Sequence, residues 1–204
     1  MVVVVDYGMG NLGSVLKSLR YLNVEAKISE SKSDIETASK LILPGVGHFS
    51  RAMAKLKDLD YVDVLNKRVL EKKVPVLGIC LGMQLLAMSS EEGESKGLGW
   101  IDAKIKKFEI EDKLRWKVPQ MGWNSIDIQR ENILLENIKQ GELFYFVHSF
   151  FMSCNDKQDI LASTDYSGDF TSIVQKNNIF GTQFHPEKSH EQGLELITNF
   201  VSKT

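Results

Sequence analysis

The alternation of short, wholly apolar runs with amphipathic segments in the first 90 residues most constrains the fold. The run Val2–Val5 is entirely β-branched, a pattern typical of a strand that is buried on both faces. An apolar stripe with a 3.6-residue period follows and predicts a helix over residues 12–22. Further buried strands are predicted at 41–43 and 74–79. Strands that alternate with helices predict a parallel sheet with right-handed crossovers.

Apolar periodicity also predicts helices at 49–59, 62–69 and 81–88. The polar residues 91–99 are expected to form a solvated loop, and the character of the sequence changes after them. Strand patterns then follow, at 101–108, 126–128, 143–152, 159–162, 172–175 and 179–184. A hairpin turn at 176–178 and a final helix that carries Leu194 and Phe200 inward complete the chain. No linker divides it, so we expect a single α/β domain over residues 1–204.

Composition excludes several classes of protein. Lys and Arg total 25 and Asp and Glu total 27, which leaves a net charge of −2 and no electrostatic argument for nucleic acid or an anionic membrane. The two cysteines, Cys80 and Cys154, provide no disulfide framework and indicate a reducing compartment. The valine run is too short for a secretion signal or a membrane span, so we expect a cytoplasmic protein.

The first strand is followed by Gly8-Met9-Gly10-Asn11-Leu12-Gly13, which matches the G-x-G-x-x-G pattern of dinucleotide-binding proteins. Glu30 follows about 20 residues later, near the end of a second β-like run. A dinucleotide-dependent oxidoreductase is therefore one hypothesis. The alternative is a tight strand-to-helix turn in which the glycines allow close packing and positive φ.

Cys80 is the candidate nucleophile. It lies between a predicted buried strand and a predicted helix, with Gly78 and Gly82 two positions to either side, as in the sharp turn that exposes a nucleophile. A helix that begins after Cys80 would aim its N–H groups at the sulfur, which favours the thiolate, and the N–H of Leu81 would reach a developing oxyanion. Cys154 lies in a β-like run without a motif and is expected to be a buried structural residue.

His185 and Glu187 are the candidate base and orienting carboxylate. They follow a predicted strand as His185-Pro186-Glu187, and residues two apart in an extended segment point the same way. The carboxylate would then fix the imidazole tautomer. A metal site is the rival use of this pair, but no further ligand cluster accompanies it, so we expect no metal. His148 is either a satisfied core histidine or part of a pocket wall.

Several segments together resemble the class I (triad) glutamine amidotransferases, in the order of that family and over essentially the whole chain. They are Pro44-Gly45-Val46-Gly47-His48-Phe49, Gly78-Ile79-Cys80-Leu81-Gly82-Met83-Gln84, Lys117-Val118-Pro119-Gln120-Met121-Gly122-Trp123-Asn124, Tyr145-Phe146-Val147-His148-Ser149-Phe150 and Gln183-Phe184-His185-Pro186-Glu187-Lys188-Ser189. Within the family the chain most resembles the glutaminase subunit of imidazole glycerol phosphate synthase.

This resemblance implies a flavodoxin-like α/β fold, with a mixed central sheet, helices on both faces and additional antiparallel strands. It implies hydrolysis of glutamine through a thioester on Cys80, with His185 and Glu187 completing a triad and no cofactor. The oxyanion hole would comprise Val46, Gly47 and Leu81. The glutamine pocket would comprise Gly45, Gly47, Gln84, His148 and Ser149.

The resemblance also implies a partner, a (β/α)8-barrel cyclase or synthase subunit that forms a heterodimer with this chain and receives the ammonia. The residues expected to face it are Asn11, Trp123, Tyr145 and Lys188. The pattern departs from the family at Gln120, where histidine is usual, and an amide cannot titrate near neutral pH. A paralogous glutaminase that supplies ammonia for a surface-glycan sugar precursor is therefore the alternative to histidine biosynthesis.

Overall fold

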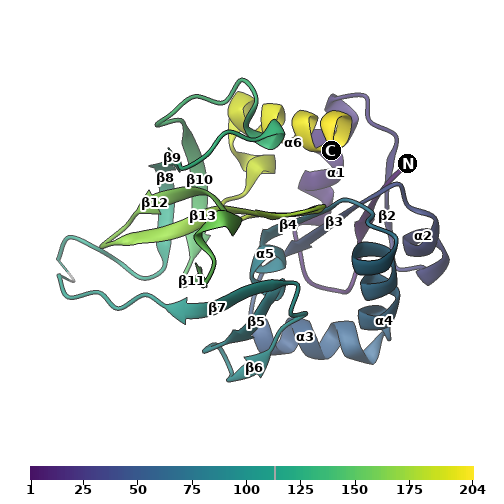
Figure 1. Cartoon of the computed structure of the whole chain (residues 1–204), viewed down its shortest axis with the longest axis horizontal. Coiled ribbons are helices and arrows are strands. Elements are labelled where there is room, and N and C mark those ends of the chain that lie inside the picture. Colours follow the sequence, from purple (N-terminus) through teal and green to yellow (C-terminus); the bar gives the residue numbers. More distant parts are fainter. Residues whose placement is uncertain (113) are drawn as a thin grey trace.

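A mixed sheet of 12 strands runs through the protein (Figure 1). The computed structural model describes residues 1–112 and 114–204. The strands of this sheet are β1 (Val2–Val5), β2 (Ala26–Ser29), β3 (Lys40–Gly45), β4 (Val76–Cys80), β5 (Ala87–Ser90), β6 (Ser95–Lys96), β7 (Ile101–Lys107), β9 (Asp127–Ile128), β11 (Phe150–Cys154), β12 (Ile160–Asp165), β13 (Asp169–Lys176) and β14 (Ile179–Thr182). Their order is β2-β1-β3-β4-β14-β13-β11-β7-β5-β6, with β12 joined to β13 and β9 to β12.

Two further strands form a separate antiparallel ribbon, β8 (Gln120–Ser125) with β10 (Leu143–His148). The α-helices are α1 (Leu12–Tyr21), α2 (Lys32–Thr37), α3 (Phe49–Asp58), α4 (Tyr61–Asn66), α5 (Leu81–Leu85) and α6 (His190–Lys203). Shorter turns are the π-helical η1 (Lys67–Glu71) and the 3-10 turns η2 (Ile133–Leu135), η3 (Lys157–Asp159) and η4 (Pro186–Lys188). Within the described residues, no helix is long and apolar enough to cross a membrane.

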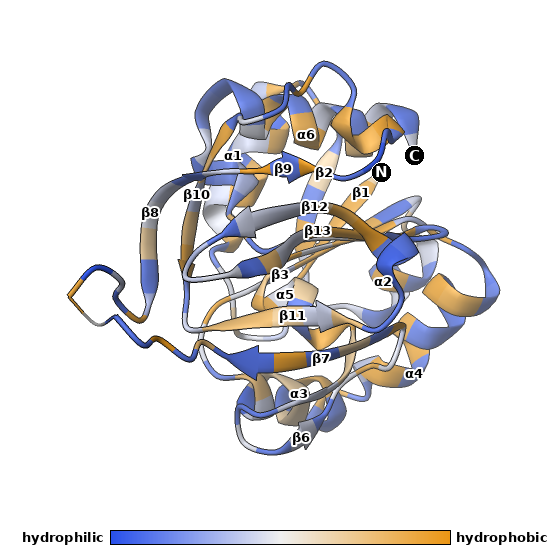
Figure 2. Ribbon diagram, turned by 60° about the vertical axis from the view of Figure 1, so that its left-hand side comes forward, coloured by the Kyte–Doolittle hydropathy of each residue, from blue (hydrophilic) through white to orange (hydrophobic). Residues whose placement is uncertain are grey.

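The valines of β1 are shared between two hydrophobic cores, one on each face of the sheet. Val3 and Val5 lie in the core that α3 and α4 cover, whereas Val2 and Val4 lie in the core that α1 and α6 cover. Successive side chains of a strand point to opposite faces, which explains this division. Figure 1 shows helices on both sides of the sheet, and the colours of Figure 2 show that hydrophobic and hydrophilic residues alternate along them. The predictions of a strand buried on both faces and of a mixed sheet covered by helices are confirmed.

Three neighbouring parallel strands bring distant parts of the sequence to one edge of the sheet. In the register of β3 and β4, Gly45 lies opposite Cys80. In the register of β4 and β14, Ile79 lies opposite Thr182. The carboxyl ends of these strands therefore meet at the same edge, where ligands bind in open α/β sheets.

The predicted helix at 81–88 is wrong beyond Leu85. The chain leaves α5 and enters β5, where Ala87 pairs with Ile101 of β7 and Ser90 pairs with Ser95 of β6. A short apolar run has the same composition in a buried helix and in a buried strand, so its pattern could not place this boundary.

The predicted strand at 143–152 is two strands that belong to different sheets. β10 pairs with β8, and β11 pairs with β7 and β13, so the chain changes sheets at Ser149. The residues of β8 carried no strand prediction, although Trp123 was expected to face a partner. Met121 and Trp123 alternate with polar residues there, but Gly122 and Asn124 have low strand propensity, which explains the omission.

Gly82 has no room for a side chain because α5 passes against β3. A Cβ at this residue would lie 1.7 Å from the carbonyl oxygen of Leu43, so the backbone would have to move. We expect Gly82→Ala to lower the free energy of unfolding by about 3 kcal/mol or more. Gly13→Ala, in α1 with open space around residue 13, is the control and is expected to raise it by about 0.5 kcal/mol. Urea unfolding measures both values, and a wild-type midpoint for Gly82→Ala would contradict this packing.

Candidate active site

Cys80 lies at the last position of β4, directly before α5, in a strained backbone conformation. Its φ is 54° and its ψ is −110°, a region that residues with a Cβ rarely adopt. The turn is tight because a Cβ at Gly78 would lie 2.7 Å from the backbone of Gly82 and Met83. The predicted sharp turn with glycines on both sides is confirmed. The helix after it has only five residues, so its dipole is weaker than the expected longer helix would provide.

His185 follows β14 and is paired with Glu187. Nδ1–H of His185 donates to Oε1 of Glu187 at 2.9 Å, and both side chains are almost completely buried. The expected contact between these side chains is confirmed, but the backbone between them is not extended. Pro186 begins the turn η4, which folds the carboxylate back towards the ring. Nδ1 is therefore engaged, and Nε2 is the nitrogen available for proton transfer.

The charge state of His185 depends on Cys80 and Glu187. Burial by itself lowers the pKa of His185, but the side chains of Cys80 and Glu187 outweigh burial and raise this pKa to about 10. Nε2 makes no hydrogen bond with any described residue. The interaction with the Cys80 side chain is nevertheless the largest one that raises the pKa of His185. An imidazolium beside a thiolate is the pairing that nucleophilic attack and later proton donation require.

A cavity of about 320 Å³ opens over Cys80 and His185. Its lining residues are Val46, Gly47, Cys80, Leu81, Gln84, Glu92, Pro119, Val147, His148, Ser149, Phe150 and His185. The structure therefore brings together nearly all the residues that the sequence nominated for catalysis, the oxyanion hole and glutamine binding. Glu187 lies behind His185, and Gly45 lies buried at the end of β3.

The segment that precedes Val46 is held by a buried tyrosine. The hydroxyl of Tyr7 donates to the carbonyl oxygen of Pro44 at 2.9 Å, and burial raises the pKa of Tyr7. A Cβ at Gly45 would lie 2.7 Å from this hydroxyl, so glycine is required for the close approach. Gly47 has a φ of +106°, a conformation that glycine adopts readily. The loop opposite Cys80 is thus anchored at its start and adopts at Gly47 a backbone conformation that favours glycine.

Glu92 is a lining residue that the sequence did not nominate. Residues 91–99 were expected to form a solvated loop, but Oε2 of Glu92 accepts the backbone N–H of Phe49 at 2.7 Å and Glu92 lines the cavity. It is the only carboxylate among the described lining residues. The acidic composition of the loop was the only signal, and composition does not reveal which carboxylate turns inward.

His148 is a buried core histidine and also part of the pocket wall, and its buried Nε2 has no hydrogen-bond partner among the described residues. Its Nδ1 bonds to the carbonyl oxygen of Phe150 at 2.8 Å, so Nδ1 carries the proton and Nε2 does not. Burial lowers the pKa of His148 to about 4. Gln120, the departure from the family, lies opposite His148 in the ribbon, and its buried amide has no hydrogen-bond partner among the described residues. The departure therefore lies beside the pocket wall and does not touch Cys80, His185 or Glu187 in any described hydrogen bond.

The expected partner-facing residues lie in one exposed patch, apart from Asn11. The Trp123 ring stacks on His190 at 4.8 Å and meets Tyr145 edge-on at 6.1 Å. Nζ of Lys188 lies 5.8 Å from the Tyr145 ring centroid. Asn11 precedes α1, which packs against the turn η4 that contains Lys188, but no described contact joins Asn11 to the others.

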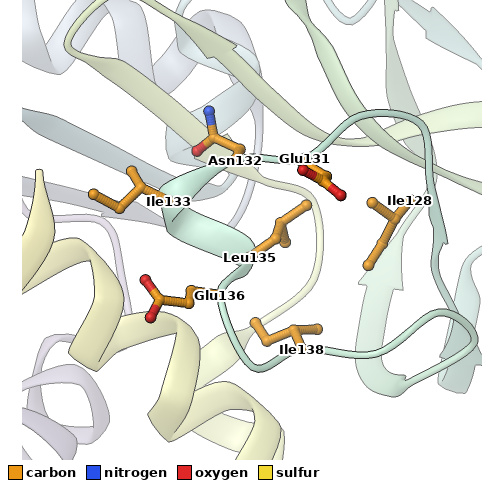
Figure 3. Close-up of a pocket in the computed structure, with 7 residues that line it drawn as sticks. All are labelled: Ile128, Glu131, Asn132, Ile133, Leu135, Glu136 and Ile138. Carbon is orange, nitrogen blue, oxygen red and sulfur yellow. The ribbon is translucent and has the colours of Figure 1, made fainter.

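A second hollow, of about 540 Å³, is formed beside η2 and α6 (Figure 3). Its lining residues are Ile128, Glu131, Asn132, Ile133, Leu135, Glu136 and Ile138. This lining contains no cysteine, serine or histidine, so the smaller cavity over Cys80 is the candidate active site. Among the described residues, no group of three or more His, Cys, Asp or Glu side chains could hold a metal ion.

The sheet and the site define a class of enzyme. A family model described as Glutamine amidotransferase class-I matches residues 3–204. The chain belongs to the class I glutamine amidotransferase family.

Relatives that match over their full length narrow the resemblance within the family. The chain is 49% identical over 203 residues, covering 100% of both chains, to "Imidazole glycerol phosphate synthase subunit HisH 2" of Methanococcus maripaludis. It is 50% identical over 201 residues, covering 98% of both chains, to the subunit of the same printed name from Pseudomonas aeruginosa. The predicted resemblance to this subunit is confirmed.

Solved structures agree on the fold. A crystal structure titled as a glutamine amidotransferase superposes with a TM-score of 0.77 at 20% identity, covering 98% of this chain and 97% of the other. The structure of PurLQS from Thermotoga maritima superposes with a TM-score of 0.69 at 18% identity, covering 98% and 96%. These likenesses confirm the expected α/β fold.

The dinucleotide hypothesis is not supported. The family match covers the glycine motif, and Gly13 lies inside α1 with open space around it. In a dinucleotide fingerprint the third glycine lets the helix pack closely on the strand, and no such close approach exists here. Gly8 and Gly10 adopt positive φ, which is the expected alternative of a tight turn. The relatives carry the name of a subunit of imidazole glycerol phosphate synthase, which does not favour the surface-glycan paralogue.

The low pKa of His148 predicts a loss of stability in mild acid. The folded protein keeps this ring neutral down to about pH 4, whereas the unfolded chain binds a proton below pH 6.5. The free energy of unfolding should therefore fall as the pH falls from 6.5 to 4, by up to about 3 kcal/mol from this residue. Urea unfolding at several pH values should show a shallower fall for His148→Gln. The exposed His190→Gln is the control, and equal slopes for His148→Gln and the wild type would contradict the assignment.

Proposed function

We propose that this chain is a glutaminase that converts glutamine and water into glutamate and ammonia through a thioester on Cys80. The observation that carries the proposal is the shared cavity of Cys80 and His185, with Glu187 bonded to the far nitrogen of the imidazole. A nucleophile, a base and an orienting carboxylate in this order form a catalytic triad. The raised pKa of His185 supports a ring that is protonated when the leaving group needs a proton.

In the proposed reaction the Cys80 thiolate attacks the side-chain carbonyl carbon of glutamine, and a C–S bond forms as the carbonyl oxygen becomes an oxyanion. When the oxyanion collapses, the C–N bond breaks, His185 gives its Nε2 proton to the nitrogen, and ammonia leaves. Water then attacks the thioester while Nε2 accepts a proton from it. Breakage of the C–S bond releases glutamate and restores the thiolate beside the imidazolium.

The lining of the cavity suits glutamine. The N–H of Leu81 begins the helix after Cys80, and the loop at Val46 and Gly47 faces it across the cavity, so these residues are the proposed oxyanion donors. Glu92 is the described lining carboxylate and is proposed to pair with the α-ammonium group. Gln84 is proposed to contact the substrate with the carbonyl of its side chain, because its NH₂ group is already used within the protein.

We further propose that the chain works as the glutaminase subunit of imidazole glycerol phosphate synthase and passes ammonia to a (β/α)8-barrel cyclase subunit in histidine biosynthesis. The names of relatives that are 49% and 50% identical over the full chain support this role. The free thiols of Cys80 and Cys154 suit the proposed cytoplasmic location.

The ribbon of β8 and β10 is the proposed contact with the cyclase subunit. Met121 and Trp123 of β8 are 66% and 44% exposed, which is unusual for large apolar side chains and typical of an interface. Behind them, β10 contacts the active site, because the N–H of His185 donates to the carbonyl oxygen of Tyr145 at 2.9 Å. The thiol of Cys80 lies 3.8 Å from the carbonyl oxygen of Val147. A partner on β8 would therefore be one strand away from both reacting side chains.

Replacement of the nucleophile tests the reaction. Cys80→Ala leaves no group to form the thioester, so glutamate release in the presence of the cyclase subunit should fall by about 10⁴-fold or more. Cys154→Ala is the matched control and should retain activity, because Cys154 lies on β11 away from the cavity lining. Coupled detection of glutamate measures both. Persistent glutamate release by Cys80→Ala would overturn the proposed function.

Replacement of Trp123 tests the partner surface. A buried Trp at the centre of an interface commonly contributes 2 kcal/mol or more, so Trp123→Ala should weaken binding of the cyclase subunit by about 30-fold. Leu59→Ala, an exposed apolar residue after α3, is the control and should leave the affinity unchanged. Isothermal titration of the two subunits gives the dissociation constants. Equal constants for Trp123→Ala and the wild type would remove β8 from the interface.

A further inference from the structure

Gln183 is a completely buried carboxamide that lies between a pocket residue and the reacting sulfur. Its Oε1 accepts a hydrogen bond from Nε2 of Gln84 at 3.1 Å, and its own Nε2 donates to Sγ of Cys80 at 3.8 Å. The backbone N–H of Gln183 also donates to the carbonyl oxygen of Ser172 at 2.9 Å, which fixes the residue after β14. Hydrogen bonds thus fix both polar atoms of the Gln183 side chain and its backbone N–H.

The direction of this chain of hydrogen bonds is set by the backbone carbonyl of Phe150. Nε2 of Gln84 donates to that carbonyl oxygen at 2.8 Å, and a carbonyl oxygen can only accept. Gln84 must therefore turn its NH₂ group towards the carbonyl of Phe150, and the same NH₂ group also contacts the side-chain amide of Gln183. If the amide of Gln183 were reversed, two NH₂ groups would face each other and an oxygen would face Sγ. The only consistent arrangement aims N–H of Gln183 at the sulfur of Cys80.

The same carbonyl oxygen fixes a second polar group of the pocket. It also accepts from Nδ1 of His148 at 2.8 Å, so both of its lone pairs are used and neither donor can rotate away without leaving a buried group unpaired. Phe150 thus orients the wall of the cavity and, through Gln84, the amide beside Cys80.

We propose that Gln183 is a catalytic residue whose amide N–H groups stabilise the thiolate form of Cys80. The inference rests on Cys80 being the nucleophile of the proposed glutaminase reaction. A donor to a charged acceptor contributes more than a donor to a neutral one, and the low dielectric of a buried site strengthens the interaction. Gln183 supports the sulfur together with His185. Because a carboxamide does not titrate near neutral pH, Gln183 keeps its N–H donors throughout the reaction.

The pH dependence of alkylation of Cys80 tests this role without glutamine and without a partner. The protein is treated with iodoacetamide at a series of pH values, and mass spectrometry quantifies the adduct on Cys80 and on Cys154 separately. In Gln183→Met, which has a similar shape but no donor, the pH of half-maximal reactivity of Cys80 should rise by about one unit. In Gln183→Glu a carboxylate oxygen faces the sulfur, and the rise should be larger, about two units.

Two controls separate this role from a structural one. Cys154, whose pKa is raised by burial to about 11, reports the integrity of the fold in the same sample and should keep its wild-type profile. Thr182→Val removes a neighbouring buried hydrogen bond, from Oγ1 of Thr182 to the carbonyl oxygen of Phe184, and should leave the Cys80 profile unchanged.

An unchanged Cys80 profile in both Gln183 variants would overturn the inference, as would an equal shift at Cys80 and Cys154. Failure of the proposed function is a different result, because it is measured as glutamate release by Cys80→Ala. A Cys80 profile that responds to Gln183 would support the inference whichever synthase the chain serves.

Discussion

The parallel pairing of β3, β4 and β14 is the constraint on which the rest of the site depends. Their register places Gly45 opposite Cys80 and Ile79 opposite Thr182, so the three chain segments leave the sheet at one edge. The proposed oxyanion loop follows β3, the proposed nucleophile Cys80 is the last residue of β4, and the proposed base His185 follows β14. The hydrophobic cores on both faces hold the strands in that register, since a slip of one residue would turn every side chain to the wrong face.

Hydrogen bonds orient several of the buried polar groups around this edge of the sheet. Glu187 holds Nδ1 of His185, and the carbonyl of Phe150 orients Gln84 and His148. The ribbon strand β10 bonds the backbone of His185 directly and again through Ser189, whose hydroxyl donates to the His185 carbonyl at 2.6 Å and accepts the N–H of Tyr145 at 3.0 Å. A single ribbon therefore carries both the exposed apolar side chains of β8 and the support of His185, the proposed base.

The sequence predicted the parts of the protein that depend on local chemistry. The β-branched run at the N-terminus, the glycines beside Cys80 and the His-Pro-Glu segment each require a particular backbone or burial, so their patterns were informative. It did not predict the short length of α5, the strand β8 or the change of sheet at Ser149, because pairing with distant strands decides them. The inward turns of Glu92 and Gln183 likewise depend on Phe49 and Gln84, which no local pattern connects.

Covalent capture of the nucleophile tests the central claim most directly. The protein, with the cyclase subunit present, would be incubated with an electrophilic analogue of glutamine, and the modified peptides would be mapped by mass spectrometry. The geometry predicts one adduct, on Cys80, that excess glutamine suppresses, because only this thiol shares a cavity with His185. An adduct on Cys154, or labelling of Cys80 that glutamine does not affect, would contradict the account.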